Sequence, residues 1–140
     1  MRIMALDVGE RRIGVAVSDA LLMTAQGIEV IHRTSPAKDW ERLRQLYNEY
    51  DVQTIVLGLP KNMNGTLGPR SEWVQEFSRQ LQEVIPQATI HFWDERLSTV
   101  AAERTLLEAD LSRSKRRQVI DKMAAVFILQ GYLNSLPHPV

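Results

Sequence analysis

The sequence contains no cysteine, so disulfide bonds and metal sites built on thiolates are excluded. This absence is consistent with a reducing compartment. No apolar stretch approaches the ~20 residues that a membrane-spanning helix needs. Asp7 and the run from Glu10 to Arg12 interrupt the only early apolar segment, so no secretory signal is visible. We therefore expect a cytoplasmic protein with no membrane partner.

The chain also lacks net charge, with 17 basic and 17 acidic side chains among its 140 residues. A protein that holds nucleic acid by bulk charge is usually strongly basic. A nucleic-acid partner would therefore have to meet a local patch, and the candidate is the run Arg113-Ser-Lys115-Arg116-Arg117. The same run also suits the solvated start of a helix, and both interpretations stay open.

What is present is typical of a folded domain. Hydrophobic residues make up 44% of the chain and charged residues 24%, which are proportions found in globular proteins. A chain of this length can bury a sizeable core by itself. No repeat, low-complexity tract or linker divides the sequence, so we expect a single domain over residues 1–140.

The start of the chain carries the most informative pattern. An apolar run ends at Asp7, Gly9 follows, and a second apolar run leads to Ser18 and Asp19. This pattern predicts a strand, a tight turn and a second strand that pairs back antiparallel. A carboxylate at the end of a buried strand is costly unless it is hydrogen-bonded or coordinates a cation. Asp7 therefore belongs to a site or hydrogen-bonds its own turn, and this motif alone fits both.

The remaining pattern predicts the element order β-β-β-α-β-α-β-α-α. Strands joined by short connections should be antiparallel, and strands reached through a helix should be parallel by right-handed crossovers. After the first two strands we expect a strand over 24–32, a helix that starts at Ser35-Pro36, a strand over 52–58, a helix from Pro69 to before Pro86, a strand over 89–93, a helix from residue 98 or 99 to about 109, a loop over 110–114 and a helix from about 115 to 136. These elements predict an α/β fold with a mixed five-stranded sheet flanked by helices.

Three carboxylates can meet at the edge where the parallel strands end, which is where such sheets bind ligands. They are Asp7, Glu95 and Asp121. If the fourth strand lies between the first and the fifth, two spacings of roughly 4.8 Å separate the first two acids, and a Glu side chain closes most of that gap. Ala124 and Ala125 are small enough to let the last helix pack closely on the sheet. Three carboxylates at one point would repel one another unless cations neutralise them.

The donor types indicate which metal to expect. Oxygen ligands without cysteine favour Mg²⁺ or Mn²⁺ over zinc. His32, His91 and His138 have no ligand-like spacing, and we interpret them as ordinary strand or surface residues. Two such ions roughly 4 Å apart hold the attacking water and the leaving oxygen in phosphodiester hydrolysis. The three acids are therefore suited to a site for one or two Mg²⁺ or Mn²⁺ ions, and phosphodiester hydrolysis is a reaction that such a site performs.

Four segments together resemble the YqgF (RuvX) family. They are residues 6–19, 58–65, 93–99 and 114–125, in this order, and the resemblance covers essentially the whole chain. The family has an RNase H-like fold, similar to that of Holliday junction resolvases of the RuvC kind, so the resemblance implies this fold. It also implies a cytoplasmic nuclease that matures the 5′ end of 16S ribosomal RNA. A resolvase role was the older proposal for the family.

The resemblance also assigns the metal ligands. Asp7 matches the family's first-strand aspartate, Glu95 the Glu of its Asp-Glu-Arg motif, and Asp121 its last-helix aspartate. The broader RNase H pattern often has an acid at the end of the fourth strand, where this chain has Gly58-Leu59-Pro60. The second acid must then be Asp94 or Glu95, and because side chains alternate along a strand only one of them points at the first-strand aspartate. We favour Glu95 and keep Asp94 as the alternative.

Eight residues are candidates for contact with nucleic acid. Arg11 and Arg12 lie in the first turn and could meet a phosphate bidentately. Lys61 and Asn64 lie on a Gly-flanked loop suited to contacts with a nucleic-acid backbone. Arg96 could balance its acidic neighbours or reach a phosphate. The set is Arg11, Arg12, Lys61, Asn64, Arg96, Lys115, Arg116 and Arg117, and ordinary surface roles stay open for them.

Four functions fit these features, because a fold alone does not separate them. The leading one is a metal-dependent nuclease that acts on structured RNA, most simply the precursor of 16S ribosomal RNA. A resolvase of four-way DNA junctions would require a dimer that presents two sites, so monomer and homodimer both stay open. A nucleotide-binding module of the actin-like ATPase or sugar-kinase type needs two such domains, and 140 residues provide one. The fourth is a non-catalytic RNA-binding assembly factor.

Overall fold

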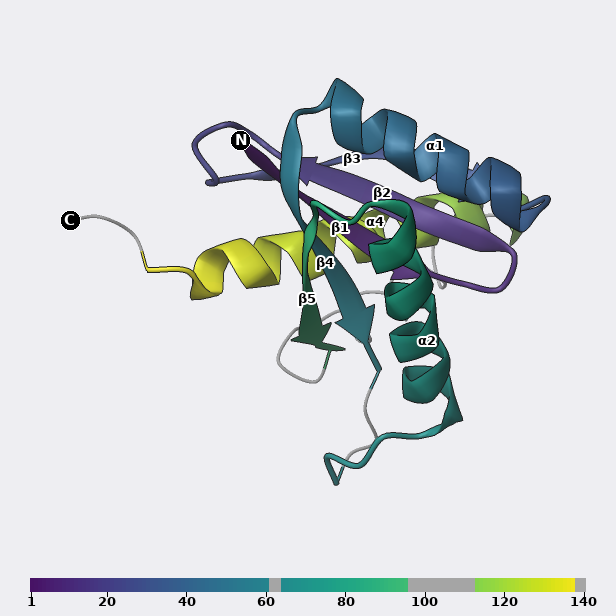
Figure 1. Ribbon diagram of the computed structural model, residues 1–140. Helices are drawn as coiled ribbons and strands as arrows, with labels where there is room; N and C mark the ends of the chain where they lie inside the picture. The colour runs from purple at the N-terminus through teal and green to yellow at the C-terminus, as the bar shows by residue number, and fades with distance from the viewer. Residues whose placement is uncertain (61–63, 96–112, 138–140) are drawn as a thin grey trace.

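One mixed sheet is built from five strands: β1 (Arg2–Val8), β2 (Arg12–Ser18), β3 (Ala25–His32), β4 (Val52–Leu59) and β5 (Thr89–Asp94). The computed structural model describes residues 1–60, 64–95 and 113–137, with side chains from residue 120 onward in the last range. The strand order is β3-β2-β1-β4-β5 (Figure 1). The first three strands pair antiparallel, whereas β4 runs parallel to both β1 and β5. The expected sheet is confirmed, with β4 between β1 and β5.

The described helices are α1 (Pro36–Glu49), α2 (Pro69–Val84) and α4 (Arg113–Ser135). Ser35 caps α1 by accepting a hydrogen bond from the Lys38 main-chain nitrogen at 3.4 Å, and proline occupies the first position of both α1 and α2. The last helix begins two residues before its expected start. Arg113 and Ser114, expected in a loop, are therefore helical. The helix expected over about 98–109 lies outside the described residues.

The sheet separates two hydrophobic cores. α1 and α2 cover one face of the sheet, and α4 runs across the other face (Figure 1). Along β1, Met4 and Leu6 belong to the core under α1 and α2, whereas Ile3 and Ala5 belong to the core under α4. Because side chains alternate along a strand, Asp7 falls on the α4 face. No helix within the described ranges is long and apolar enough to cross a membrane.

Small residues let α4 approach the sheet closely. Ala124 and Ala125 are fully buried against the sheet, as their sizes predicted. At Gly14 of β2 the contact is closer still, since an added Cβ would overlap the main-chain oxygen of Asp121. Gly14 is also the cross-strand partner of Asp7. A single glycine in β2 therefore lets the Asp121 segment of the last helix lie beside the end of β1.

Candidate active site

Asp7 lies where two cavities meet at the end of β1. We call the first the Glu95 cavity. It is small, about 40 Å³, and its polar side chains come from Asp7, Glu95 and Arg70. We call the second the Asp121 cavity. It is larger, about 320 Å³, and is lined by Asp7, Gly9, Glu10, Arg11, Arg12, Arg70 and Asp121. The three expected acids thus surround one strand end, with Asp7 common to both cavities.

The register of β5 separates Asp94 from Glu95. Asp94 pairs with Leu59, whose side chain belongs to the core under α1 and α2, so alternation directs the Asp94 side chain to that face. Glu95 instead lines the cavity that contains Asp7. Its Oε1 atom lies 3.4 Å from the position that a Cβ on Gly58 would take. The structure therefore brings Glu95 rather than Asp94 to the first-strand aspartate, and its role as a metal ligand stays a prediction.

Asp121 is engaged by an arginine in this structure. Its Oδ2 atom lies 2.5 Å from the Nε atom of Arg12, and both side chains are about one quarter exposed or less. Arg12 was expected to meet a phosphate, so this ion pair with a candidate metal ligand is a difference from the expectation. Across the described part of the chain, no group of three or more histidine, aspartate or glutamate residues lies close enough to hold a metal ion. Asp121 thus shares a cavity with Asp7 but not with Glu95, and the described residues show no cluster of all three acids.

The Glu95 cavity nevertheless fits a divalent cation. Two carboxylates, from Asp7 and Glu95, line it, and such oxygens are the ligands that Mg²⁺ and Mn²⁺ prefer. Its volume is about 40 Å³, whereas a cavity needs only roughly 10–15 Å³, measured in the same way, to hold one water molecule. Gly58 has no side chain, which leaves the space beside Glu95 open. A side chain at this position would occupy that space and would also press on Ile128. Residue types and room therefore agree with the expected cofactor on this side.

The remaining candidates fall into three groups. Arg11 is exposed and lines the Asp121 cavity. The Oδ1 atom of Asn64 accepts hydrogen bonds from the main-chain nitrogen and the hydroxyl of Thr66, at 3.1 and 2.7 Å. This atom therefore stabilises the loop in which Asn64 itself lies. Lys61 and Arg96 lie outside the described residues. Lys115, Arg116 and Arg117 lie at the start of α4, where the structure describes the helix but not their side chains.

Arg70 is a site residue that the sequence interpretation missed. It lines both cavities, and its Nη2 atom donates to the carbonyl oxygen of Val8 at 2.9 Å. Its guanidinium lies 5.4 Å from the ring centroid of Trp73, one turn further along α2. One signal could have found it: Arg70 follows Pro69 at the start of the helix that leaves the carboxyl end of β4.

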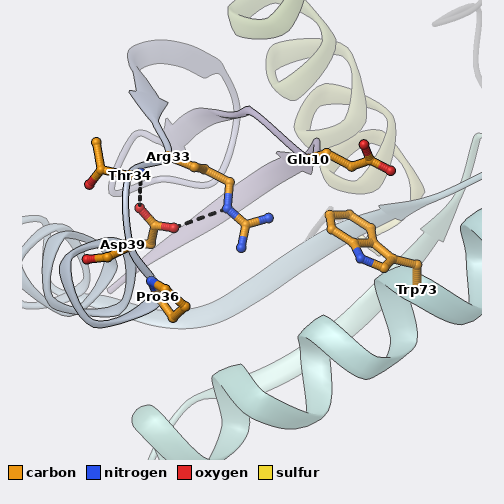
Figure 2. Close-up of a pocket in the computed structure, with 7 residues that line it drawn as sticks. Glu10, Arg33, Thr34, Pro36, Asp39 and Trp73 are labelled. Carbon is orange, nitrogen blue, oxygen red and sulfur yellow. Dashed lines mark hydrogen bonds and ion pairs between the residues drawn. The ribbon is translucent and has the colours of Figure 1, made fainter.

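A third cavity lies beside the Asp121 cavity and shares Glu10 with it (Figure 2). Its volume is about 370 Å³. Arg33 and Asp39 form an ion pair at 3.1 Å across it, and Asp39 is buried. Arg33 also donates to the carbonyl oxygen of Gly9 at 3.0 Å and lies 5.7 Å from the Trp73 ring centroid. These contacts tie the turn between β1 and β2 to the starts of α1 and α2.

A family model described as "RuvX: Holliday junction resolvase" matches residues 1–135 of this chain. Two relatives, from Desulfitobacterium hafniense (strain Y51) and Clostridium botulinum (strain Hall), both bear the name "Putative pre-16S rRNA nuclease". The first is 63% identical, over 96% of this chain and 92% of the relative. The second is 59% identical, over 97% and 98%.

Two solved structures share the fold. One is RuvC of T. thermophilus in complex with a Holliday junction substrate, with a TM-score of 0.54, 14% identity and coverage of 96% of this chain and 95% of that one. The other is the Holliday junction resolvase of fowlpox virus, with a TM-score of 0.52, 14% identity and coverage of 97% and 100%. At this identity the likeness concerns the fold alone, and it confirms the expected RNase H-like architecture.

Proposed function

The chain belongs to the RuvX family, and from that premise we propose that it is a nuclease that hydrolyses phosphodiester bonds in the precursor of 16S ribosomal RNA. The observation that carries the proposal is the identity of 59% to 63%, over nearly the full length, to proteins named for this activity. Such a substrate agrees with the cytoplasmic location expected from the sequence. The geometry at Asp7 supplies a site where the reaction fits.

Asp7 and Glu95 would hold a divalent cation, Mg²⁺ or Mn²⁺, in the Glu95 cavity. When bound, the ion lowers the pKa of water and offsets negative charge on a phosphate. A second ion would need the carboxylate of Asp121, which Arg12 holds in this structure. Release of that ion pair would give both partners a role, because the aspartate could bind metal and the arginine could bind phosphate.

The reaction itself is a hydrolysis. The oxygen of a water molecule forms a bond to phosphorus, and the bond between phosphorus and one ester oxygen breaks. That ester oxygen leaves with the electron pair and takes up a proton, while the attacking water gives a proton to solvent. The Asp121 cavity would receive the phosphate, because Arg11, Arg12 and Arg70 line it beside the carboxylates. The net charge of the chain is zero, and three acids of this cavity balance its three arginines, so these arginines would hold the phosphate by directed hydrogen bonds rather than by an excess of positive charge.

A second candidate is the resolution of four-way DNA junctions. The description of the matching family model, "Holliday junction resolvase", favours it. This activity would require two copies of the chain to present two sites on one junction. Homodimer formation in the presence of junction DNA is therefore the observation that would favour it over the RNA nuclease.

The test compares both substrates on one preparation. Purified protein is incubated with a precursor 16S rRNA fragment and with a four-way DNA junction, each with Mg²⁺, with Mn²⁺ and with EDTA. We expect cleavage of the RNA that EDTA abolishes. Cleavage of the junction alone would support the resolvase, and binding of the RNA without cleavage under every condition would support a non-catalytic assembly factor. The Asp7→Asn protein serves as the control for contaminating nucleases.

A further inference from the structure

Arg70 occupies a central place in the site. Of the described residues that line the Glu95 cavity, only Asp7 and Arg70 also line the Asp121 cavity. A phosphate that approaches the three carboxylates from the Asp121 cavity would therefore meet this guanidinium next to Asp7. Arg12 lines the same cavity, but its Nε atom already donates a hydrogen bond to Asp121.

Two contacts hold the Arg70 side chain in place. Its Nη2 atom donates to the Val8 carbonyl at 2.9 Å, and the Trp73 ring lies under the guanidinium with 5.4 Å from Cζ to the ring centroid. A guanidinium carries five N–H donors in a fixed plane, so one bond to a carbonyl leaves donors for a further acceptor. An arginine that is already oriented loses less conformational entropy when it binds phosphate.

Trp73 is itself held by its neighbours. Its ring packs against Phe77 with the centroids 6.4 Å apart, and Arg33 lies on it from the third cavity (Figure 2). The ring is thus part of the packed face of α2 rather than a loose surface group. This arrangement suits a residue that orients its neighbour.

We propose that Arg70 is a catalytic residue that donates hydrogen bonds to a non-bridging oxygen of the phosphate being cleaved, and that Trp73 positions it. The proposal rests on the proposed nuclease function. Negative charge grows on the phosphate oxygens as the new bond to phosphorus forms, and a fixed guanidinium offsets it. The carboxylates alone would repel the phosphate, so a cation of the protein beside them serves both binding and the chemical step.

The main test is Arg70→Gln, with Arg79→Gln as the matched control. Arg79 lies on the same helix, is exposed and pairs with Glu76, so its replacement removes an equal charge away from both cavities. Single-turnover cleavage at saturating RNA should fall about 100-fold in Arg70→Gln and stay unchanged in Arg79→Gln. Log affinity for RNA falls as log salt rises. In EDTA, the magnitude of this negative slope should decrease by about one in Arg70→Gln and stay unchanged in Arg79→Gln.

Two further measurements separate catalysis from structure. Mn²⁺ should raise the melting temperature of Arg70→Gln as it does that of the wild type, because the carboxylates are intact. Loss of that rise, or a wild-type cleavage rate at saturating RNA, overturns the proposal. If Arg70→Gln does not fold, Arg70→Lys decides: slower cleavage at an unchanged melting temperature supports the contact, and a wild-type rate overturns it.

The proposal and the nuclease function can fail separately. If the wild type cleaves no RNA under any condition, the proposed function is wrong, and the salt slope in EDTA still decides whether Arg70 meets a phosphate. A smaller slope for Arg70→Gln than for Arg79→Gln then supports a phosphate contact. An equal slope overturns it.

The positioning role of Trp73 has its own test. Trp73→Leu should slow cleavage about two- to fivefold, the size expected for one cation–π contact, and Trp73→Phe should restore most of the rate. In the Arg70→Gln background, Trp73→Leu should have no further effect on the rate, because the group it positions is gone. Additive effects of the two substitutions would overturn the positioning role.

Discussion

The two cavities that meet at Asp7 differ in size, charge and construction. The Glu95 cavity is small and combines two carboxylates with one arginine. The Asp121 cavity is about eight times larger, and in its lining three arginines are balanced by Asp7, Glu10 and Asp121. The small side has an excess of carboxylates and suits a cation, whereas the large side has the room and the arginine donors to receive a phosphate group. Under the proposed function, Asp7 would therefore connect the metal site to the phosphate site.

A glycine lies next to an acid of each cavity, Gly14 next to Asp121 and Gly58 next to Glu95, and the two glycines pack against different kinds of atom. At Gly14 a Cβ would overlap the main chain of Asp121, so backbone packs on backbone there. At Gly58 a Cβ would lie 2.5 Å from Cδ1 of Ile128, which is the far end of a side chain. The Asp121 side is thus fixed by the approach of α4 to β2. The shape of the Glu95 cavity is fixed by the packing of the Ile128 side chain, which can move aside more easily than a main chain can.

The largest effect should come from Asp7→Asn, which alters both cavities at once. Asparagine keeps the shape but removes the charge that a metal needs, so metal-dependent cleavage should fall about 100-fold or more. The fold should be retained or become more stable without metal, because a carboxylate close to others is removed. Thermal melts should show that Mn²⁺ raises the melting temperature of the wild type and raises that of the variant much less. Retained cleavage at matched metal concentration would exclude the metal mechanism.

The next comparison concerns the small cavity alone. Glu95→Gln should slow single-turnover cleavage by about tenfold or more relative to Asp94→Asn, because only Glu95 of the two lines the cavity with Asp7. Single-turnover rates report the chemical step without product release. A larger loss in Asp94→Asn would show that the second ligand is assigned wrongly, although a metal-dependent mechanism would survive.

The two glycines give a matched pair that tests how each cavity is built. Gly14→Ala should destabilise the protein by about 3 kcal/mol or more, because neither main chain can move aside without shifting α4. Gly58→Ala should cost about 1–2 kcal/mol, because Ile128 can change its rotamer. Denaturant unfolding of both variants measures the difference. Equal losses would mean that the close approach at Asp121 is not what fixes the position of α4.

The smallest effect on the fold should come from the basic run at the start of α4. Replacing Lys115, Arg116 and Arg117 together with Ala should weaken RNA binding, and the salt slope should fall by about one for each phosphate that the variant no longer neutralises. The melting temperature should barely change, since exposed charges contribute little to stability. An unchanged slope would place RNA binding at Arg11 and the Asp121 cavity instead. A large loss of stability would favour a role in ordering the helix.

Much of this fold could be predicted, because local patterns carry it. The two apolar runs and the glycine turn after Asp7 predicted the antiparallel strands, and the later succession of strands and helices predicted the parallel ones. Strand parity together with the family motif selected Glu95 over Asp94, and the structure brings Glu95 to the first strand. Ala124 and Ala125 predicted the close packing of the last helix.

The contacts that give the site its character could not be predicted in this way. Arg12 and Asp121 are 109 positions apart, and Arg70 and Val8 are 62 apart, so no local spacing connects them. Each pair meets only because a whole helix lies at a particular height and tilt on the sheet. The sequence by itself determined which elements form, their order and which acids lie at the strand ends, since these depend on local periodicity. Only the tertiary structure decided which arginine holds Asp121 and which one stands between the two cavities, since that depends on how packed elements meet.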